Sequence, residues 1–120
     1  MAKYVDGFVI PVPKKNVQAY RRMAQKAGKV WVEFGALEFR ECAIDDAKAD
    51  KMVPFGRAAK AKPSETVFFS WIVYKSRADR QRIMKKVMKD KRIMAMMNPD
   101  GMPFDPSRMV YGGFKVMVDL

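Results

Sequence analysis

The segment Val67–Tyr74 constrains the fold more than any other part of the chain, because seven of its eight residues are apolar or aromatic. Aromatic and β-branched residues favour strands, and an apolar run without polar alternation is typical of a strand covered on both faces. A buried helix can give the same short run, so the flanking residues decide. A proline and a serine precede the run, and Ser76 opens a new helical pattern. We therefore predict a central strand over Glu65–Tyr74.

The segment after the first strand has the clearest helical periodicity. Apolar side chains recur there in steps of three and four, and lysine, arginine and glutamine occupy the opposite side. The apolar set is Val17, Tyr20, Ala24, Ala27, Trp31 and Phe34. Pro13 suits the first turn of this helix, and Gly35 suits a left-handed residue at its end. Gly28 costs about 1 kcal/mol relative to alanine, but the stripe keeps its phase across it, so we predict one helix.

A second helix is predicted after the central strand. Ser76 and Asp79 form a capping pair of the S-x-x-D type at its start. The helix ends near Asp90, and a short turn through Met94 and Met97 follows. Its apolar stripe consists of Ile83, Met84, Val87 and Met88.

Three further segments alternate as strands do: Tyr4–Val12, Ala36–Ile44 and Met109–Val118. The glycine pair at 112–113 interrupts the last of them, as a bulge or a close approach of neighbouring strands. Residues 47–63 form a connection whose length is usual for functional or mobile loops.

The predicted order is strand, helix, strand, strand, helix, strand within one domain over residues 1–120. Right-handed crossovers then give an α+β fold, a ferredoxin-like βαββαβ antiparallel sheet with both helices on one face. We expect the other face to carry Phe8, Ile10 and one row of the central strand. An apolar face of this size needs a partner, and a second copy packed sheet against sheet would provide it.

Composition excludes several kinds of chemistry. The chain has no histidine and one cysteine, Cys42, which rules out Ser-His-Asp and Cys-His catalysis, His-ligated zinc and an intrachain disulfide. We therefore expect no cofactor and no metal. The longest apolar runs are too short for a membrane span, and the single thiol fits a cytoplasmic protein. The net charge of +11 fits a nucleic-acid partner or an anionic surface, and equally well mere solubility.

Five stretches follow the pattern of a known family: Tyr4–Pro13, Gly35–Cys42, Phe69–Arg77, Met102–Asp105 and Gly112–Lys115. Together they resemble the bacterial domain of unknown function 1428 family over nearly the whole chain. The resemblance implies a place among the dimeric α/β barrels, beside the antibiotic-biosynthesis monooxygenases and stress-responsive barrel proteins. It also implies a homodimer whose two sheets close into a barrel. This family has no settled activity, so the resemblance assigns no catalytic residue.

A cavity on the barrel side of the sheet is the predicted ligand site, with Asp6 and Arg40 as its polar anchors. A buried acid near an arginine can have a shifted pKa and perform acid–base chemistry. The alternative is structural: ion pairs at the dimer seam, an inert thiol and aromatic packing in the core. The candidate residues are Asp6, Glu38, Arg40, Cys42, Trp71, Tyr74 and Tyr111.

A basic stripe on the second helix is a candidate for phosphate contacts, and a solvated helix face is the alternative. It consists of Arg82, Lys85, Lys86, Lys89 and Arg92. The RNA-recognition motif shares the predicted strand order, but the central strand lacks its RNP1 pattern. Two hypotheses result. The chain is a small-molecule binder or cofactor-free enzyme of the antibiotic-biosynthesis-monooxygenase type, or it is a non-enzymatic dimer that associates weakly with nucleic acid through its basic helices.

Overall fold

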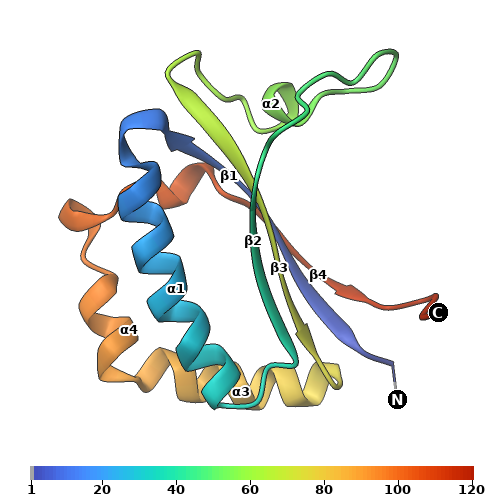
Figure 1. Cartoon of the computed structure of the whole chain (residues 1–120). Coiled ribbons are helices and arrows are strands. Elements are labelled where there is room, and N and C mark those ends of the chain that lie inside the picture. The colour runs from blue at the N-terminus through green and yellow to red at the C-terminus, as the bar shows by residue number, and fades with distance from the viewer. Residues whose placement is uncertain (1) are drawn as a thin grey trace.

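Four antiparallel strands form one sheet in the order β2-β3-β1-β4, as the computed structural model of residues 2–120 shows (Figure 1). The strands are β1 (Tyr4–Pro13), β2 (Glu38–Ala43), β3 (Glu65–Tyr74) and β4 (Val110–Lys115). Strand β3 pairs with both β1 and β2, so the apolar segment is a central strand with the predicted bounds. The ferredoxin-like order is confirmed.

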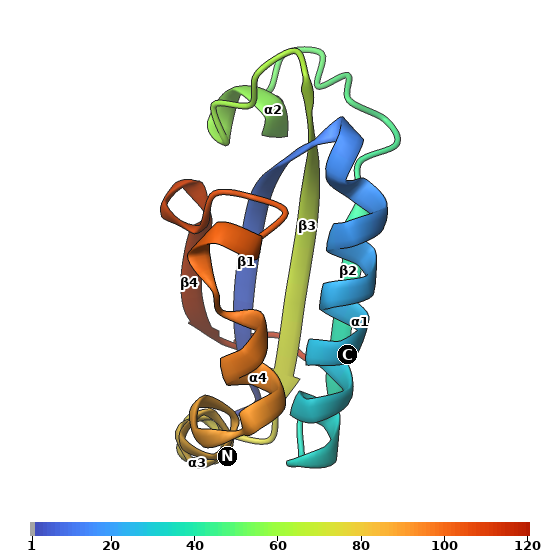
Figure 2. The ribbon, with the colours of Figure 1, turned by 90° about the vertical axis from the view of Figure 1, so that its left-hand side faces the viewer.

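Three helices cover one face of this sheet (Figures 1 and 2). They are α1 (Val17–Glu33), α3 (Arg77–Lys89) and α4 (Lys91–Met96). Short 3-10 turns η1 (Lys14–Asn16), η2 (Pro99–Gly101) and η3 (Pro106–Arg108) join the elements. The connection between β2 and β3 contains a fourth helix, α2 (Phe55–Ala58), which lies away from the three others (Figure 1).

Several boundaries differ from the sequence prediction. Strand β1 continues through Pro11 to Pro13, because β4 pairs with β1 only as far as Val9 and leaves the rest of that edge open. An edge of this kind tolerates proline, which donates no hydrogen bond. Strand β4 is shorter than predicted, and its two glycines do not interrupt it. The predicted turn after Asp90 is the helix α4, in which Ile93 is buried.

The core lies between the sheet and the helices. Val30 from α1, Ile83 and Val87 from α3, and Ile72 and Tyr74 from β3 are all buried there. The capping pair is confirmed, since the Ser76 side chain accepts a hydrogen bond from the backbone N–H of Asp79 at 3.1 Å. The predicted positive φ beyond α1 is also present, at +120° in Gly35.

The two faces of the sheet are assigned differently from the prediction. Phe8 and Ile10 pack beneath the helices and not on the uncovered face. The other face carries the alternate row of each strand and is called the open face, because α1, α3 and α4 do not cover it. Only its end near Phe69 is covered, by Phe55 of α2. Its apolar members include Val5, Val9, Phe69, Trp71, Val110 and Phe114. Among residues 2–120, no helix combines the length and apolarity needed to cross a membrane.

Candidate functional site

A cavity of about 350 Å³ lies between the sheet and the helices. Its wall is mostly apolar and includes Phe8, Ile10, Met23, Trp31, Ile72 and Met84. Ligand sites in proteins are usually apolar cavities of about this size with a few polar groups in the wall. The polar side chains of this cavity lie in two places, one around Glu41 and one around Asp6.

The first polar centre is the carboxylate of Glu41 on β2. The Tyr20 hydroxyl donates a hydrogen bond to its Oε1 at 2.7 Å, and the Ser70 hydroxyl donates to the same oxygen. Burial raises the pKa of Glu41 above its usual value, and the two hydrogen bonds offset only part of this effect. Burial next to the same carboxylate also raises the pKa of Tyr20. An acid with a raised pKa in an apolar cavity is a candidate for proton transfer.

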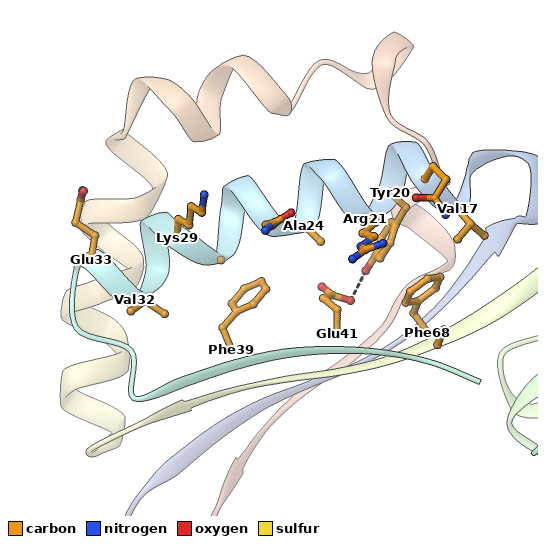
Figure 3. Close-up of a pocket in the computed structure, with 14 residues that line it drawn as sticks. Val17, Tyr20, Arg21, Ala24, Lys29, Val32, Glu33, Phe39, Glu41 and Phe68 are labelled. Atoms are coloured by element: carbon orange, nitrogen blue, oxygen red, sulfur yellow. Dashed lines mark hydrogen bonds between the residues drawn. The ribbon is translucent and has the colours of Figure 1, made fainter. Parts of the chain in front are cut away.

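The other oxygen of Glu41, Oε2, accepts no hydrogen bond from any described residue. No buried side-chain oxygen or nitrogen in the described part of the chain lacks a partner, so Oε2 must be accessible. In Figure 3 the two oxygens point apart, with the dashed bond to Tyr20 on one of them. Glu41 therefore has one anchored oxygen and one open oxygen.

A groove of about 910 Å³ runs along the outside of this site, between α1 and the edge strand β2 (Figure 3). Arg21 and Lys29 from α1 contribute to its wall. Tyr20, Ala24, Phe39 and Glu41 line both the groove and the cavity. These four residues therefore lie between the cavity and the solvent-facing groove.

The second polar centre is Asp6 on β1, whose side chain is 1% exposed. Arg80 donates to both carboxylate oxygens, from Nε at 3.2 Å and from a terminal nitrogen at 3.0 Å. The hydroxyls of Tyr74 and Tyr111 each donate one further bond, both at 2.9 Å. Burial and the neighbouring carboxylate raise the pKa of both tyrosines. Four donors occupy the acceptor sites of Asp6, so its role is to hold Arg80 and the two phenols in place.

Asp6 and Arg40, the two predicted polar anchors, both border the cavity, but they lie in neighbouring rows of the sheet. Asp6 lies opposite Ile72, and Ile72 lies opposite Phe39, so these three side chains share the helix-covered face. Arg40 lies in the neighbouring row, where it is exposed on the open face. The partner of Asp6 is instead Arg80 from α3.

The seven candidate residues fall into two groups. Asp6, Tyr74 and Tyr111 meet under the helices, as described. The other four belong to the open row of the strands: Glu38, Arg40, Cys42 and Trp71. Two of them, Arg40 and Trp71, also border the cavity. Of these, Trp71 donates from Nε1 to Glu38 at 2.7 Å, while Cys42 lies beside Phe69 on the neighbouring strand.

Sequence reasoning missed Glu41 and Arg80, although each follows a pattern. Glu41 alternates with Phe39 and Ala43, so it is a carboxylate in an otherwise apolar row of β2. Arg80 lies three and seven residues before Ile83 and Val87, which places it in phase with the apolar stripe of α3. A charged residue in phase with an apolar row needs a buried partner.

The basic stripe is exposed along its whole length. Arg82 forms an ion pair with Asp79 at 2.7 Å, and Arg92 forms ion pairs with Glu33 at 2.6 Å and Asp90 at 2.9 Å. These carboxylates compete with any phosphate for both arginines.

Two solved structures share this fold. One is a dimeric ferredoxin-like protein from an uncultured marine organism, with a TM-score of 0.60, 12% identity and full coverage of both chains. The other is an uncharacterised NIPSNAP domain protein from Burkholderia xenovorans, with a TM-score of 0.58 and 12% identity over 92% of this chain and 91% of that one. At this identity the likeness concerns the fold alone.

Similarity in sequence is much closer to one group of proteins. The chain is 45% identical over 117 residues to the uncharacterised protein YbaA of Escherichia coli strain K12, which covers 98% of both chains. The YbaA protein of Shigella flexneri matches to the same extent. Residues 3–106 match the model of a family described as a protein of unknown function, DUF1428. The chain therefore belongs to the DUF1428 family.

Proposed function

We propose that this protein binds a small, largely apolar molecule in the cavity between its sheet and its helices, and that Glu41 is the polar group that orients the molecule. The observation that carries the proposal is the open oxygen of a half-buried carboxylate in the wall of an apolar cavity. A cavity of about 350 Å³ has room for a molecule of one or two rings.

The same carboxylate would serve as a general acid or base if the bound molecule is a substrate. Its raised pKa brings the two protonation states closer in energy near neutral pH. Tyr20 and Ser70 hold the anchored oxygen, which fixes the direction of the open one. This places the proposal within the enzyme-or-binder hypothesis and moves its centre from the predicted Asp6–Arg40 pair to Glu41.

Binding of an uncharged fluorescent probe tests the cavity directly. N-phenyl-1-naphthylamine brightens in apolar surroundings, so we expect saturable fluorescence enhancement with the purified protein. The variant Ala27→Leu adds three carbon atoms to a residue of the cavity wall and should weaken binding roughly tenfold or more.

The matched control is Ala78→Leu, the same change at an exposed position of α3. It should leave probe binding unchanged. Equal binding by both variants would place the probe elsewhere on the molecule and count against the proposal.

We further propose that the working form is a homodimer joined through the open face. Apolar side chains on that face remain well exposed, with Phe69 at 44%, Val110 at 50% and Phe114 at 60%. The molecule is a slab of 38 × 37 × 20 Å. A broad face of this slab is wide enough for the roughly 800 Å² per partner of a standard stable interface. The dimeric state of the ferredoxin-like relative from the marine organism supports the same assembly.

Gel filtration with light scattering tests the dimer, which should give about twice the 13.8 kDa chain mass. Phe114→Lys places a charge on the open face and should shift the protein toward monomer. Met94→Lys is the control, because Met94 is also 60% exposed but lies on α4, on the opposite side of the sheet (Figure 1). A wild-type monomer at micromolar concentration would overturn the dimer.

A further inference from the structure

The open oxygen of Glu41 determines what kind of chemical group can bind beside it. Because both hydroxyl donors bind Oε1, the ionised carboxylate of Glu41 offers the ligand a hydrogen-bond acceptor and no donor at this point. An oxygen acceptor on the ligand would be repelled by Oε2, and a methyl group would leave that oxygen without a partner. A ligand donor is the complement that the site lacks.

The charge around Glu41 favours an uncharged donor over an ammonium group. Arg21 and Lys29 lie along the groove on the other side of Glu41, and the chain as a whole carries +11. This field opposes the entry of a further cation.

The floor of the cavity indicates the body of the ligand. Glu41, Ser70, Phe8 and Tyr111 lie in one row across the four strands, because each is opposite the next in the strand register. The rings of Phe8 and Tyr111 are in contact, with centroids 5.1 Å apart. A flat ring packed along this row would lie over Phe8, with its polar edge at Glu41.

We infer that the ligand of the cavity is a flat, apolar molecule with an uncharged hydroxyl group of the phenol type, which donates a hydrogen bond to Oε2 of Glu41. This inference rests on the proposed function and specifies the chemical class of the ligand.

Three probes of similar size test it on the wild-type protein: p-cresol, 4-methylanisole and p-xylene. They carry a hydroxyl donor, an ether acceptor and a methyl group at the same position of the ring. Binding is measured by calorimetry and by tryptophan fluorescence, to which Trp31 and Trp71 at the cavity both contribute. We expect p-cresol to bind about tenfold or more tightly than either of the others, although p-xylene is the most apolar of the three.

A substitution at Glu41 provides the second test. In Glu41→Gln the amide oxygen takes the place of Oε1, since both hydroxyls donate there, and the amide NH₂ replaces the open oxygen. The acceptor thus becomes a donor. The ratio of the affinities for p-cresol and 4-methylanisole should therefore fall to about 1, or the preference should reverse. Glu38→Gln makes the same change on the open face of the same strand and should keep the wild-type preference.

The outcomes separate this inference from the proposed function. Equal binding of all three probes by the wild type, or an unchanged preference in Glu41→Gln, would overturn the hydroxyl ligand and leave the apolar cavity standing. Tighter binding of 4-methylbenzylamine than of p-cresol would identify a cation site and also overturn it. Failure of every probe to bind would overturn both. If Glu41→Gln does not fold, the order of affinities in the wild type still decides.

Discussion

Gly28 sets the distance between α1 and the edge of the sheet. A Cβ atom added at this position would lie 2.7 Å from Cδ1 of Phe39, which is too close for any real contact. The intrinsic penalty of glycine in a helix is therefore offset by a close approach that brings α1 onto β2. This approach also places Tyr20 within reach of Glu41.

We expect Gly28→Ala to destabilise the protein by about 1–3 kcal/mol, because Phe39 must move and the overpacking exceeds the gain in helix propensity. Urea unfolding followed by circular dichroism measures the change. Gly56→Ala is the control, since an added Cβ there meets nothing within 4 Å. A stabilising effect of Gly28→Ala would show that the ring moves aside without cost.

Glu41 gives a second prediction at this scale, through the pH dependence of stability. The folded state binds the carboxyl proton more tightly than the unfolded chain, because the pKa of Glu41 in the folded protein is raised above its ordinary value of 4.5. Its stabilising contribution is complete below that value and is lost as the pH rises through the raised one. Ionisation of Glu41 should thus lower the free energy of unfolding once the pH exceeds the raised pKa.

The free energy of unfolding of Glu41→Gln should therefore rise relative to wild type as the pH increases above the ordinary carboxyl pKa of 4.5. Denaturant titrations at several pH values measure the difference. The same series for Glu38→Gln corrects for the general loss of one negative charge. If the corrected difference in free energy of unfolding between Glu41→Gln and wild type does not change with pH, the raised pKa of Glu41 is contradicted.

Single residues also show where prediction from sequence stops. The predicted alternation of this strand is confirmed, since Glu38, Arg40 and Cys42 lie on one side of β2 and Phe39 and Glu41 on the other. It did not tell which side the helices cover, because both rows of β1 contain apolar residues. That choice depends on strand register and on the partner that Asp6 finds in α3, both of which are long-range.

At the scale of elements, the long and strongly periodic segments were predictable and the short ones were not. The bounds of β3 and the cap of α3 follow from local patterns. Helices α2 and α4 have four and six residues, too few to show a helical period or to be stable alone. Each depends on tertiary contacts, such as Phe55 of α2 against the ring of Phe69 at 5.6 Å.

The start of α3 carries a prediction of its own. Ser76 is buried and its side chain satisfies the backbone N–H of Asp79, so Ser76→Ala leaves a donor without a partner. We expect a loss of about 1 kcal/mol of stability, measured by chemical denaturation. Ser64→Ala, at an exposed turn position, should change stability by less than about 0.5 kcal/mol. Equal effects of the two variants would mean that the cap contributes nothing.

At the scale of the whole molecule, the charge of +11 predicts weak binding to nucleic acid. Lys85, Lys86 and Lys89 are exposed on α3, while the two arginines of the stripe are engaged by carboxylates. Contacts to phosphate alone give dissociation constants of roughly 10⁻⁴–10⁻⁶ M at physiological salt. Fluorescence anisotropy with single-stranded RNA should show this range, no dependence on base sequence, and a steep loss with added salt.

Replacing the three lysines by alanine should reduce both the affinity for RNA and its salt dependence. The matched triple variant changes Lys14, Lys15 and Lys3, which lie at the two ends of β1 and are also exposed. A nanomolar complex that survives about 200 mM salt would show instead that the chain is a dedicated nucleic-acid protein.

The interleaving of the two faces along each strand has a consequence for how such a chain can vary. Even-numbered residues of β1 and β3 face the helices and include most of the cavity residues of these strands, and their odd-numbered neighbours belong to the open face. Substitutions at every second position can therefore alter what enters the cavity while leaving the assembly intact, and the reverse holds for the other set. Insertion of a single residue within β1 would exchange the two sets. Changes in the length of these strands should accordingly be far rarer among functional variants than changes in their composition.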